Sequence, residues 1–234
     1  NPNGTYLLPN EPNAENNLDA YGMNFLANGF TVNSSDQQLN ASGGTYFYMS
    51  FAADQSAAPV LADSFNTNLY TGNGTSQAVT GLGFSPSLVW IKQRDAVRGQ
   101  NWYDVLRGPN NIIFSNTTGA QDTTSTEVLQ AFNTDGFSLG NLSAVNASGG
   151  QYVSWNWKAN SIPTINTDGS ITNNVVSVNQ AAGFSIIKYT GNGVNNATVG
   201  HGLSAAPELV INKGLSSTSN WRVASSGLAN TNGY

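Results

Sequence analysis

The chain has 234 residues, no cysteine, one histidine and a formal net charge of −5. The lack of cysteine excludes disulfide scaffolds and cysteine-based zinc or iron–sulfur sites. Only 9% of the residues are charged, and eight scattered Lys and Arg give no basic patch, so a nucleic-acid partner is not expected. Aromatic residues make up 10% of the chain and 33 residues are asparagine, which predicts a folded protein with an uncharged polar surface.

The hydrophobic stretches are short, rich in aromatic or β-branched residues and bounded by Gly, Asn, Ser or Pro, which predicts strands. In chain order these are 29–32, 45–52, 88–93, 105–107, 111–114, 128–132, 136–139, 151–158, 175–178, 184–189, 208–213 and 221–224. The stretch 151–158 carries aromatic residues on both faces, which is typical of a central strand covered on both sides. The pattern predicts an all-β chain of tandem antiparallel β-sandwich modules of the jelly-roll or lectin-like type.

No apolar run approaches the ~20 residues of a membrane span, so neither membrane insertion nor a signal peptide is expected. The dipeptides Asn73-Gly74, Asp135-Gly136 and Asp168-Gly169 predict tight turns, because Gly and Asn tolerate a positive φ. We interpret the two Thr-Gly-Asn-Gly runs as hairpin turns, since the flanking residues predict strands where a phosphate-binding loop would precede a helix.

Two internal repeats dominate the sequence. Residues 64–108 resemble residues 183–227, and both contain Tyr-Thr-Gly-Asn-Gly, Leu-Val and a tryptophan in the same order. Residues 29–46 resemble residues 136–152, and both contain Asn-Ala-Ser-Gly-Gly. The chain is therefore divided into the second half of a module with a linker (1–63), a complete module (64–160), and a linker with the first half of a further module (161–234). Either the chain is a segment of a longer array of modules, or the folding unit begins and ends at other positions than these three segments suggest.

Carboxylates are the first candidates for catalysis, because a glycosidase needs two of them on either side of a sugar. Asp95, Asp104 and Glu127 are the candidates in the complete module. The sequence repeat places Val223 at the match of Asp104 and no acid at the match of Asp95. Surface ion pairs with neighbouring arginines, such as Asp104 with Arg107, explain these residues more simply. We expect no catalytic residues and a protein that is not an enzyme.

His201 and the loop 166–169 are the remaining candidates for acid–base or metal chemistry. Leu82 stands at the match of His201, which favours a turn side chain over a catalytic base. The run Asn-Thr-Asp-Gly at 166–169 lacks the dense oxygen ligands of a calcium loop and is more typical of a turn. We therefore expect no metal and no cofactor.

Asn101, Trp102, Tyr103 and Asp104 form the best local cluster for ligand binding. Protein surfaces that bind sugars combine an aromatic ring, which stacks on the sugar, with amide or carboxylate hydrogen bonds. The sequence repeat matches Trp102 with Trp221, and this recurrence favours a core role for the ring. A ligand-binding role for the cluster stays open as the second interpretation.

Several motifs resemble a tandem module of marine bacteriophage virion proteins. They are Asn-Thr-Asp-Gly-Ser-Ile-Thr at 166–172, Ala-Gly-Phe-Ser-Ile at 182–186, Tyr-Thr-Gly-Asn-Gly at 189–193, Ala-Thr-Val-Gly-His-Gly-Leu at 197–203 and Asn-Trp-Arg-Val at 220–223, with the module's closing half at 13–16, 25–30 and 40–53. Such proteins are similar to tail-fibre or other surface structural proteins whose function is uncharacterised, so no catalytic residue can be transferred.

The resemblance implies a non-enzymatic structural or adhesion protein on the virion surface, as a tail fibre, decoration or capsid-attached protein. Its implied partners are other virion proteins, further copies of itself in a homo-oligomer, most often a trimer for fibres, and host surface glycans. The alternative is an extracellular carbohydrate-binding module of a cellular protein. A depolymerase or glycosidase is the third reading.

Overall fold

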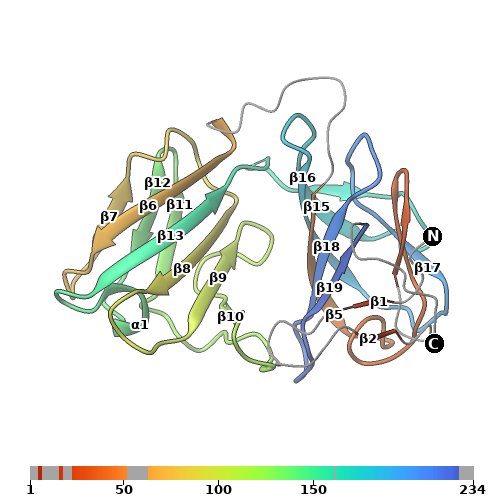
Figure 1. Cartoon of the computed structure of the whole chain (residues 1–234), viewed down its shortest axis with the longest axis horizontal. Coiled ribbons are helices and arrows are strands. Elements are labelled where there is room, and N and C mark those ends of the chain that lie inside the picture. The colour runs from red at the N-terminus through yellow and green to blue at the C-terminus, as the bar shows by residue number, and fades with distance from the viewer. Residues whose placement is uncertain (1–4, 7–15, 18–22, 52–62, 161, 227–234) are drawn as a thin grey trace. The chain divides into compact units, whose positions relative to one another are not determined.

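Each of the two units of this chain is a sandwich of antiparallel sheets in the computed structural model (Figure 1). The structure describes residues 5–6, 16–17, 23–51, 63–160 and 162–226. Unit 2 is one continuous stretch, residues 60–163, whereas unit 1 combines residues 1–59 with residues 164–234. The predicted all-β antiparallel sandwich is confirmed.

Unit 2 contains a five-stranded sheet in the order β10-β9-β8-β13-β6 and a three-stranded sheet in the order β11-β12-β7. β13 lies between β8 and β6, so the strand with aromatic residues on both faces is central, as predicted. The elements are β6 (Phe65–Thr71), β7 (Gln77–Thr80), β8 (Leu88–Gln93), β9 (Gln100–Asp104), β10 (Ile113–Phe114), β11 (Leu129–Asn133), β12 (Gly136–Leu139), α1 (Ser143–Asn146) and β13 (Gln151–Trp157).

Unit 1 repeats this plan with a different chain route. Its sheets have the orders β14-β15-β16-β5-β18-β19 and β17-β4-β3, and a short pair β1-β2 is also present. The elements are β1 (Thr5–Tyr6), β2 (Asn16–Asn17), β3 (Met23–Leu26), β4 (Gly29–Val32), β5 (Thr45–Phe51), β14 (Thr164–Asn166), β15 (Asn174–Asn179), β16 (Phe184–Thr190), β17 (Ala197–Gly200), β18 (Leu209–Gly214) and β19 (Arg222–Ser225).

The order β16-β5-β18-β19 in unit 1 is the counterpart of β6-β13-β8-β9 in unit 2. β5 comes from the N-terminal part of the chain, yet it pairs with β16 on one side and β18 on the other. The segments 1–63 and 161–234, which the sequence divided into two half-modules, therefore share a sheet within one unit. The folding units therefore begin and end at other positions in the chain than the division into modules predicted.

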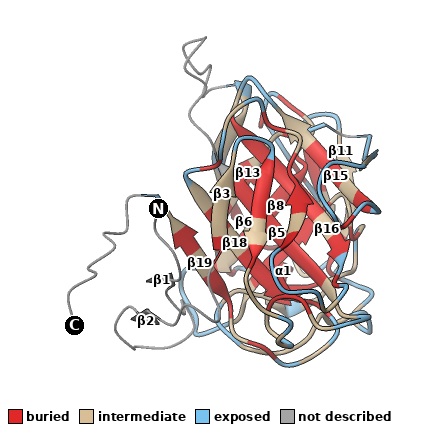
Figure 2. Ribbon diagram, turned by 90° about the vertical axis from the view of Figure 1, so that its right-hand side faces the viewer, coloured by how far each residue is buried: buried red, intermediate tan, exposed pale blue. Residues whose placement is uncertain are grey.

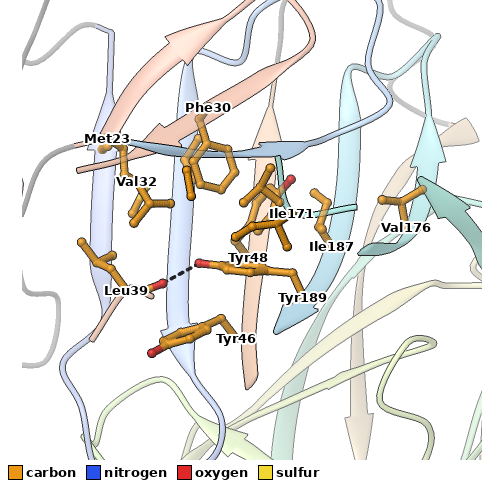
Figure 3. Close-up of a cluster of buried hydrophobic side chains, with 14 residues drawn as sticks. Met23, Phe30, Val32, Leu39, Tyr46, Tyr48, Ile171, Val176, Ile187 and Tyr189 are labelled. Carbon is orange, nitrogen blue, oxygen red and sulfur yellow. Dashed lines mark hydrogen bonds between the residues drawn. The ribbon is translucent and has the colours of Figure 1, made fainter. Parts of the chain in front are cut away.

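The inward faces of the two sheets form the core of each unit, and the strands carry most of the buried residues (Figure 2). Strand alternation selects these residues: in β16, Ile187 and Tyr189 point into the core of unit 1, and in β13, Tyr152 does so in unit 2. Figure 3 shows the core of unit 1, where Tyr46, Tyr48 and Tyr189 from β5 and β16 lie together. Tyr46 stacks on Tyr189 with ring centroids 5.3 Å apart.

The two repeated motifs of unit 2 contact each other, and we call this contact the loop junction of unit 2 (residues 72–75 with 146–150). The side chain of Asn146 is buried, accepts a hydrogen bond from the Asn73 amide (2.9 Å), and donates to the Gly140 carbonyl (2.7 Å) and to Thr75 O. Gly72 N donates to Gly150 O at 2.8 Å. A Cβ at position 72 would collide with the carbonyl oxygen of Ala147, so this close approach requires glycine.

The loop junction of unit 1 (residues 191–194 with 40–44) repeats the hydrogen bonds that Asn146 makes with the Asn73 amide and the Thr75 carbonyl. Asn192 N donates to Asn40 Oδ1 (3.0 Å), and Asn40 Nδ2 donates to Val194 O (2.9 Å). Tyr189 donates its hydroxyl to Leu39 O at 2.8 Å, the dashed line in Figure 3. Here the junction joins segments that are about 150 residues apart in the sequence.

The prediction that Thr-Gly-Asn-Gly forms a hairpin is wrong. β6 pairs with β13 and β7 pairs with β12, so residues 72–76 carry the chain from one sheet to the other. Asn-Gly signals a local turn, but long-range pairing decides which strands the turn connects. By contrast, Asp135-Gly136 does close the hairpin of β11 and β12.

The strand predicted at 105–107 is also wrong, because those residues form a turn after β9. The carboxylate of Asp104 accepts hydrogen bonds from Leu106 N (2.9 Å) and Arg107 N (3.0 Å), which reverses the chain there.

β6 was not predicted because its inward face carries amides. Asn66 and Asn68 donate to the carbonyls of Leu82 and Thr80, both at 3.0 Å.

We predict that Asn146→Ala lowers the free energy of unfolding by about 3 kcal/mol, because it leaves buried backbone groups of the loop junction without partners. Urea denaturation measures the change. Asn141→Ala, at an exposed position five residues earlier, is the matched control and should change the stability by less than about 0.5 kcal/mol. Equal effects of the two variants would contradict a structural role for the junction.

Candidate functional site

The four candidate ligand-binding residues all lie on β9 (Gln100–Asp104), in the five-stranded sheet of unit 2. Strand alternation sends Asn101 and Tyr103 to the inward face and Trp102 and Asp104 to the outward face. All four are buried. The structure therefore does not bring them together on one accessible surface.

On the inward face, Tyr103 belongs to the hydrophobic core of unit 2. Burial raises the pKa of its phenol well above the ordinary value. Asn101 donates from Nδ2 to the carbonyl of Gly99 at 3.2 Å. Both residues take part in the packing of the sandwich.

On the outward face, Asp104 forms an ion pair with Arg107 in which the side chains are 0% and 1% exposed. The sequence predicted that this ion pair lies at the surface, and this prediction is wrong because both side chains are buried. The Arg107 guanidinium also donates to the carbonyls of Asn111 (2.8 Å) and Trp102 (3.0 Å). The pair thus ties the end of β9 to the loop before β10.

Trp102 belongs to a row of three tryptophans across neighbouring strands, which we call the tryptophan row (Trp155, Trp90 and Trp102). Trp155 is opposite Trp90 in β13 and β8, and Trp90 is opposite Trp102 in β8 and β9. The ring centroids are 4.9 Å apart in both contacts, with interplanar angles of 47° and 58°. Trp90 and Trp155 are half-buried, whereas Trp102 is 3% exposed.

Two further features extend this outward face. Trp157 of β13 packs against Phe65 of β6 with ring centroids 4.9 Å apart, and Leu69 on β6 is 63% exposed. Aromatic faces of this kind can stack on apolar surfaces or on sugar rings. The sequence did not reveal the row, because its members are separated by 12 and 53 positions and only the strand register aligns them.

The tryptophan row is absent from the corresponding positions of unit 1. Trp90 pairs with Trp102 as Ile211 pairs with Val223, so Val223 is the structural counterpart of Trp102. The sequence match of Trp102 with Trp221 is therefore wrong, and so is the match of Asp104 with Val223. Ser225, opposite Leu209, is the counterpart of Asp104, which lies opposite Leu88. The outward faces of the two units have thus diverged in chemistry.

A shallow, open depression of about 300 Å³ lies on the three-stranded sheet of unit 2. Its lining is uncharged and combines apolar surface with amide and hydroxyl groups: Ser76, Gln77, Ala78, Gln130, Ser138 and Leu139. Aromatic rings do not line this depression, and the tryptophan row lies on the other sheet. The amide-lined and aromatic features are therefore on separate sheets.

Asp95 and Asp104 lie too far apart to act as a pair of catalytic carboxylates. Asp104 lies opposite Leu88 at the start of β8, while Asp95 follows Gln93 at its end, so at least five strand residues, roughly 17 Å, separate their positions. A glycosidase places its carboxyl groups no more than about 9.5 Å apart. Asp95 accepts hydrogen bonds from Gln93 Nε2 (2.9 Å) and Gln151 N (3.1 Å), which lower the pKa of its carboxyl group. Glu127 is exposed in the loop before β11.

His201 is fully buried in the turn after β17, and its Nδ1 accepts a hydrogen bond from Leu203 N at 2.9 Å. Burial lowers the pKa of its imidazole. Leu82, its sequence match in unit 2, is also buried. The 166–169 run forms a turn in which Asn166 Oδ1 accepts a hydrogen bond from Asp168 N at 2.7 Å.

Lys213 on β18 is a buried cation that the sequence did not single out. Its Nζ donates to Gly214 O at 2.8 Å, and burial lowers the pKa of the amine to about 8.

No group of three or more metal-ligating side chains occurs among the described residues. Within that part of the chain, no helix has the length and apolar character to cross a membrane.

A family model described as a domain of unknown function (DUF7483) matches residues 1–55 and 61–234, which covers both sandwich units. The chain belongs to this family. No curated protein and no solved structure matches it. The DUF7483 match includes both chain segments of unit 1 as well as unit 2. The family model therefore describes the two sandwich units together.

We predict that Arg107→Leu lowers the free energy of unfolding by about 3 to 5 kcal/mol, because Asp104 would remain as a buried carboxylate without its counter-ion. The double variant Asp104→Ser with Arg107→Leu should recover most of this loss, since serine stands at the counterpart position 225. Guanidinium denaturation measures both variants. Equal losses in the single and double variants would refute the argument from the unpaired charge.

Proposed function

We propose that this chain is a non-enzymatic structural or adhesion protein on the exterior of a bacteriophage particle, as a tail-fibre, decoration or capsid-attached component. The loop junctions carry this proposal. Asn40 and Asn146 are both buried and accept equivalent hydrogen bonds from the amides of Asn192 and Asn73, and the glycines around them are repeated. The two units therefore share the contacts that hold a sandwich together.

The positions whose side chains could bind a ligand or carry out chemistry differ between the two units, which supports a scaffold role. Asp104 corresponds to Ser225, and the tryptophan row corresponds to aliphatic and methionine side chains. A repeated scaffold with variable outward faces suits a protein that assembles with other virion proteins and with copies of itself. The resemblance of residues 166–223 to virion modules supports the same location at the virion surface.

A second function, binding of surface glycans, is favoured by the tryptophan row. Tilted rings on adjacent strands present an aromatic surface to which a sugar ring could stack, and two of the three rings are half-buried. Such binding would serve a phage adhesin on its host. It would equally serve an extracellular carbohydrate-binding module of a cellular protein, which is the alternative to the phage proposal.

Antibodies against the purified chain should label intact phage particles in electron micrographs, and peptides of the chain should occur in the mass spectrum of purified virions. The same antibodies should not label particles of a phage whose copy of the coding sequence is deleted. Absence of the chain from particles, with secretion by uninfected cells, would overturn the proposal in favour of a cellular binding module.

We predict that Trp155→Met weakens binding to surface polysaccharide by roughly 2- to 12-fold, the range expected for the loss of one aromatic contact. Methionine is the counterpart residue in unit 1, at position 49, so the sheet should be retained. A glycan array followed by fluorescence titration measures the affinity. Trp221→Phe, in unit 1, is the control. Unchanged affinity of Trp155→Met would exclude the row as the sugar contact.

A further inference from the structure

β6 forms an open edge of the five-stranded sheet of unit 2 (Figure 1). One side of this strand pairs with β13 over seven residues, and no described strand pairs with its other side. In unit 1 the counterpart strand β16 has β15 on that other side, in antiparallel register over five residue pairs. The same fold therefore covers this edge in unit 1 and leaves it open in unit 2.

The open edge of β6 carries backbone groups that have no partner. Lys158 N donates to Ser64 O at 2.8 Å, so the even-numbered residues of β6 point their amides and carbonyls toward β13. The backbone groups of Phe65, Thr67 and Leu69 point the other way, and no described residue forms a hydrogen bond with them. An added strand can pair with these groups, as happens when proteins bind extended segments at a sheet edge.

β6 also lacks the features that keep exposed strand edges from pairing. Native edges are protected by charged side chains, by proline or by β-bulges. β6 reads Phe-Asn-Thr-Asn-Leu-Tyr-Thr, without a charge or a proline, and its register with β13 contains no bulge. Leu69 is 63% exposed, and its counterpart in unit 1 is Lys188. The side chains of β6 therefore permit a further strand to pair with it.

The sequence of β6 indicates which strand fits this edge. Residues 65–69 are chemically palindromic about Thr67, with an asparagine on each side of it and an apolar residue at each end. Antiparallel pairing of two such strands about a two-fold axis at Thr67 places Phe65 of one strand opposite Leu69 of the other. Aromatic and aliphatic residues opposed in this way stabilise a sheet. The backbone groups that lack partners are then opposite one another, so β6 is complementary to itself.

We propose that two copies of this chain associate through β6, with antiparallel pairing centred on Thr67, so that their five-stranded sheets become one continuous sheet. A two-fold axis uses the same surface on both copies, so each open edge covers the other and the assembly closes as a dimer. Leu69, which is exposed in the single chain, then packs against Phe65 of the second copy.

This inference assigns a surface to the self-assembly that is part of the proposed function, and it rests on that part alone. Its test in solution is separate from the test on phage particles. Absence of the chain from virions would leave the β6 dimer standing, and a monomer in solution would leave the location on the virion standing.

A disulfide across the two-fold axis tests this geometry, because the natural chain contains no cysteine. In a dimer of Thr67→Cys the two new thiols occupy opposed, hydrogen-bonded strand positions, whose Cα separation of about 5.5 Å suits a disulfide. Oxidation of the purified variant, followed by electrophoresis without reductant, should give a band at twice the monomer mass of 24.6 kDa. A band at the monomer mass alone would overturn the pairing centred on Thr67.

The matched control is Thr123→Cys, at an exposed threonine in the loop before β11. This position does not belong to β6, so the variant should stay at the monomer mass under the same oxidation. Equal amounts of covalent dimer from Thr67→Cys and Thr123→Cys would mean random surface cross-linking and would overturn the assignment to β6.

Two substitutions without cysteine should abolish the dimer while the near-ultraviolet circular dichroism shows that the chain remains folded. Thr67→Pro removes an edge amide to which no described residue is hydrogen-bonded, and edge strands tolerate proline at such positions. Leu69→Lys introduces the residue that unit 1 has at the counterpart position, and it places a charge on the paired edge.

Light scattering measures the mass of the natural chain and of both variants. The natural chain should show a dimer whose share rises with concentration, whereas the variants should stay at 24.6 kDa. A dimer that survives both substitutions would use another surface and would overturn the assignment to β6. A natural chain that stays monomeric at every concentration up to about 1 mM would overturn the dimer itself.

Discussion

The buried asparagine of each loop junction is the contact on which both sandwiches depend. Asn146 and Asn40 each bridge the loop that enters the smaller sheet and the turn that precedes the central strand. Because these side chains hydrogen-bond to backbone groups, each satisfies polar atoms that sheet pairing leaves unpaired. The nearby glycines permit the close approach of the two backbones. In this way two short motifs, far apart in the sequence, align both sheets.

The sequence contained enough information to predict the fold class, the repeated motifs and several strands with their limits. β4, β8 and β12 have the predicted bounds because each is a short apolar run between turn residues. The contact between the repeated motifs was not predictable, since nothing local indicates that Asn146 reaches Asn73. Similarly, matching by identity aligned Trp102 with Trp221, although strand register aligns Trp102 with Val223.

The candidate site was less predictable than the fold. Asn101 to Asp104 look like one polar and aromatic cluster in the sequence, but a strand sends alternate residues to opposite faces. The tryptophan row requires three strands in register, and only the sheet order reveals it. The burial of the Asp104–Arg107 pair was likewise hidden, because the sequence shows the two charges but not how far the fold buries them.

The uneven distribution of tryptophan has an optical consequence. Four of the five tryptophans, including the closely packed row, are in unit 2, and Trp221 is in unit 1. Rings in van der Waals contact couple their electronic transitions, so the near-ultraviolet circular dichroism and most of the fluorescence of this protein report on unit 2. The phenols of Tyr46, Tyr48 and Tyr189 lie together in unit 1. Unit 2 also holds a stacked tyrosine pair, Tyr70 with Tyr152, so tyrosine signals come from both sandwiches. The coupled tryptophan signal, by contrast, allows the melting of unit 2 to be followed in the intact chain without a label.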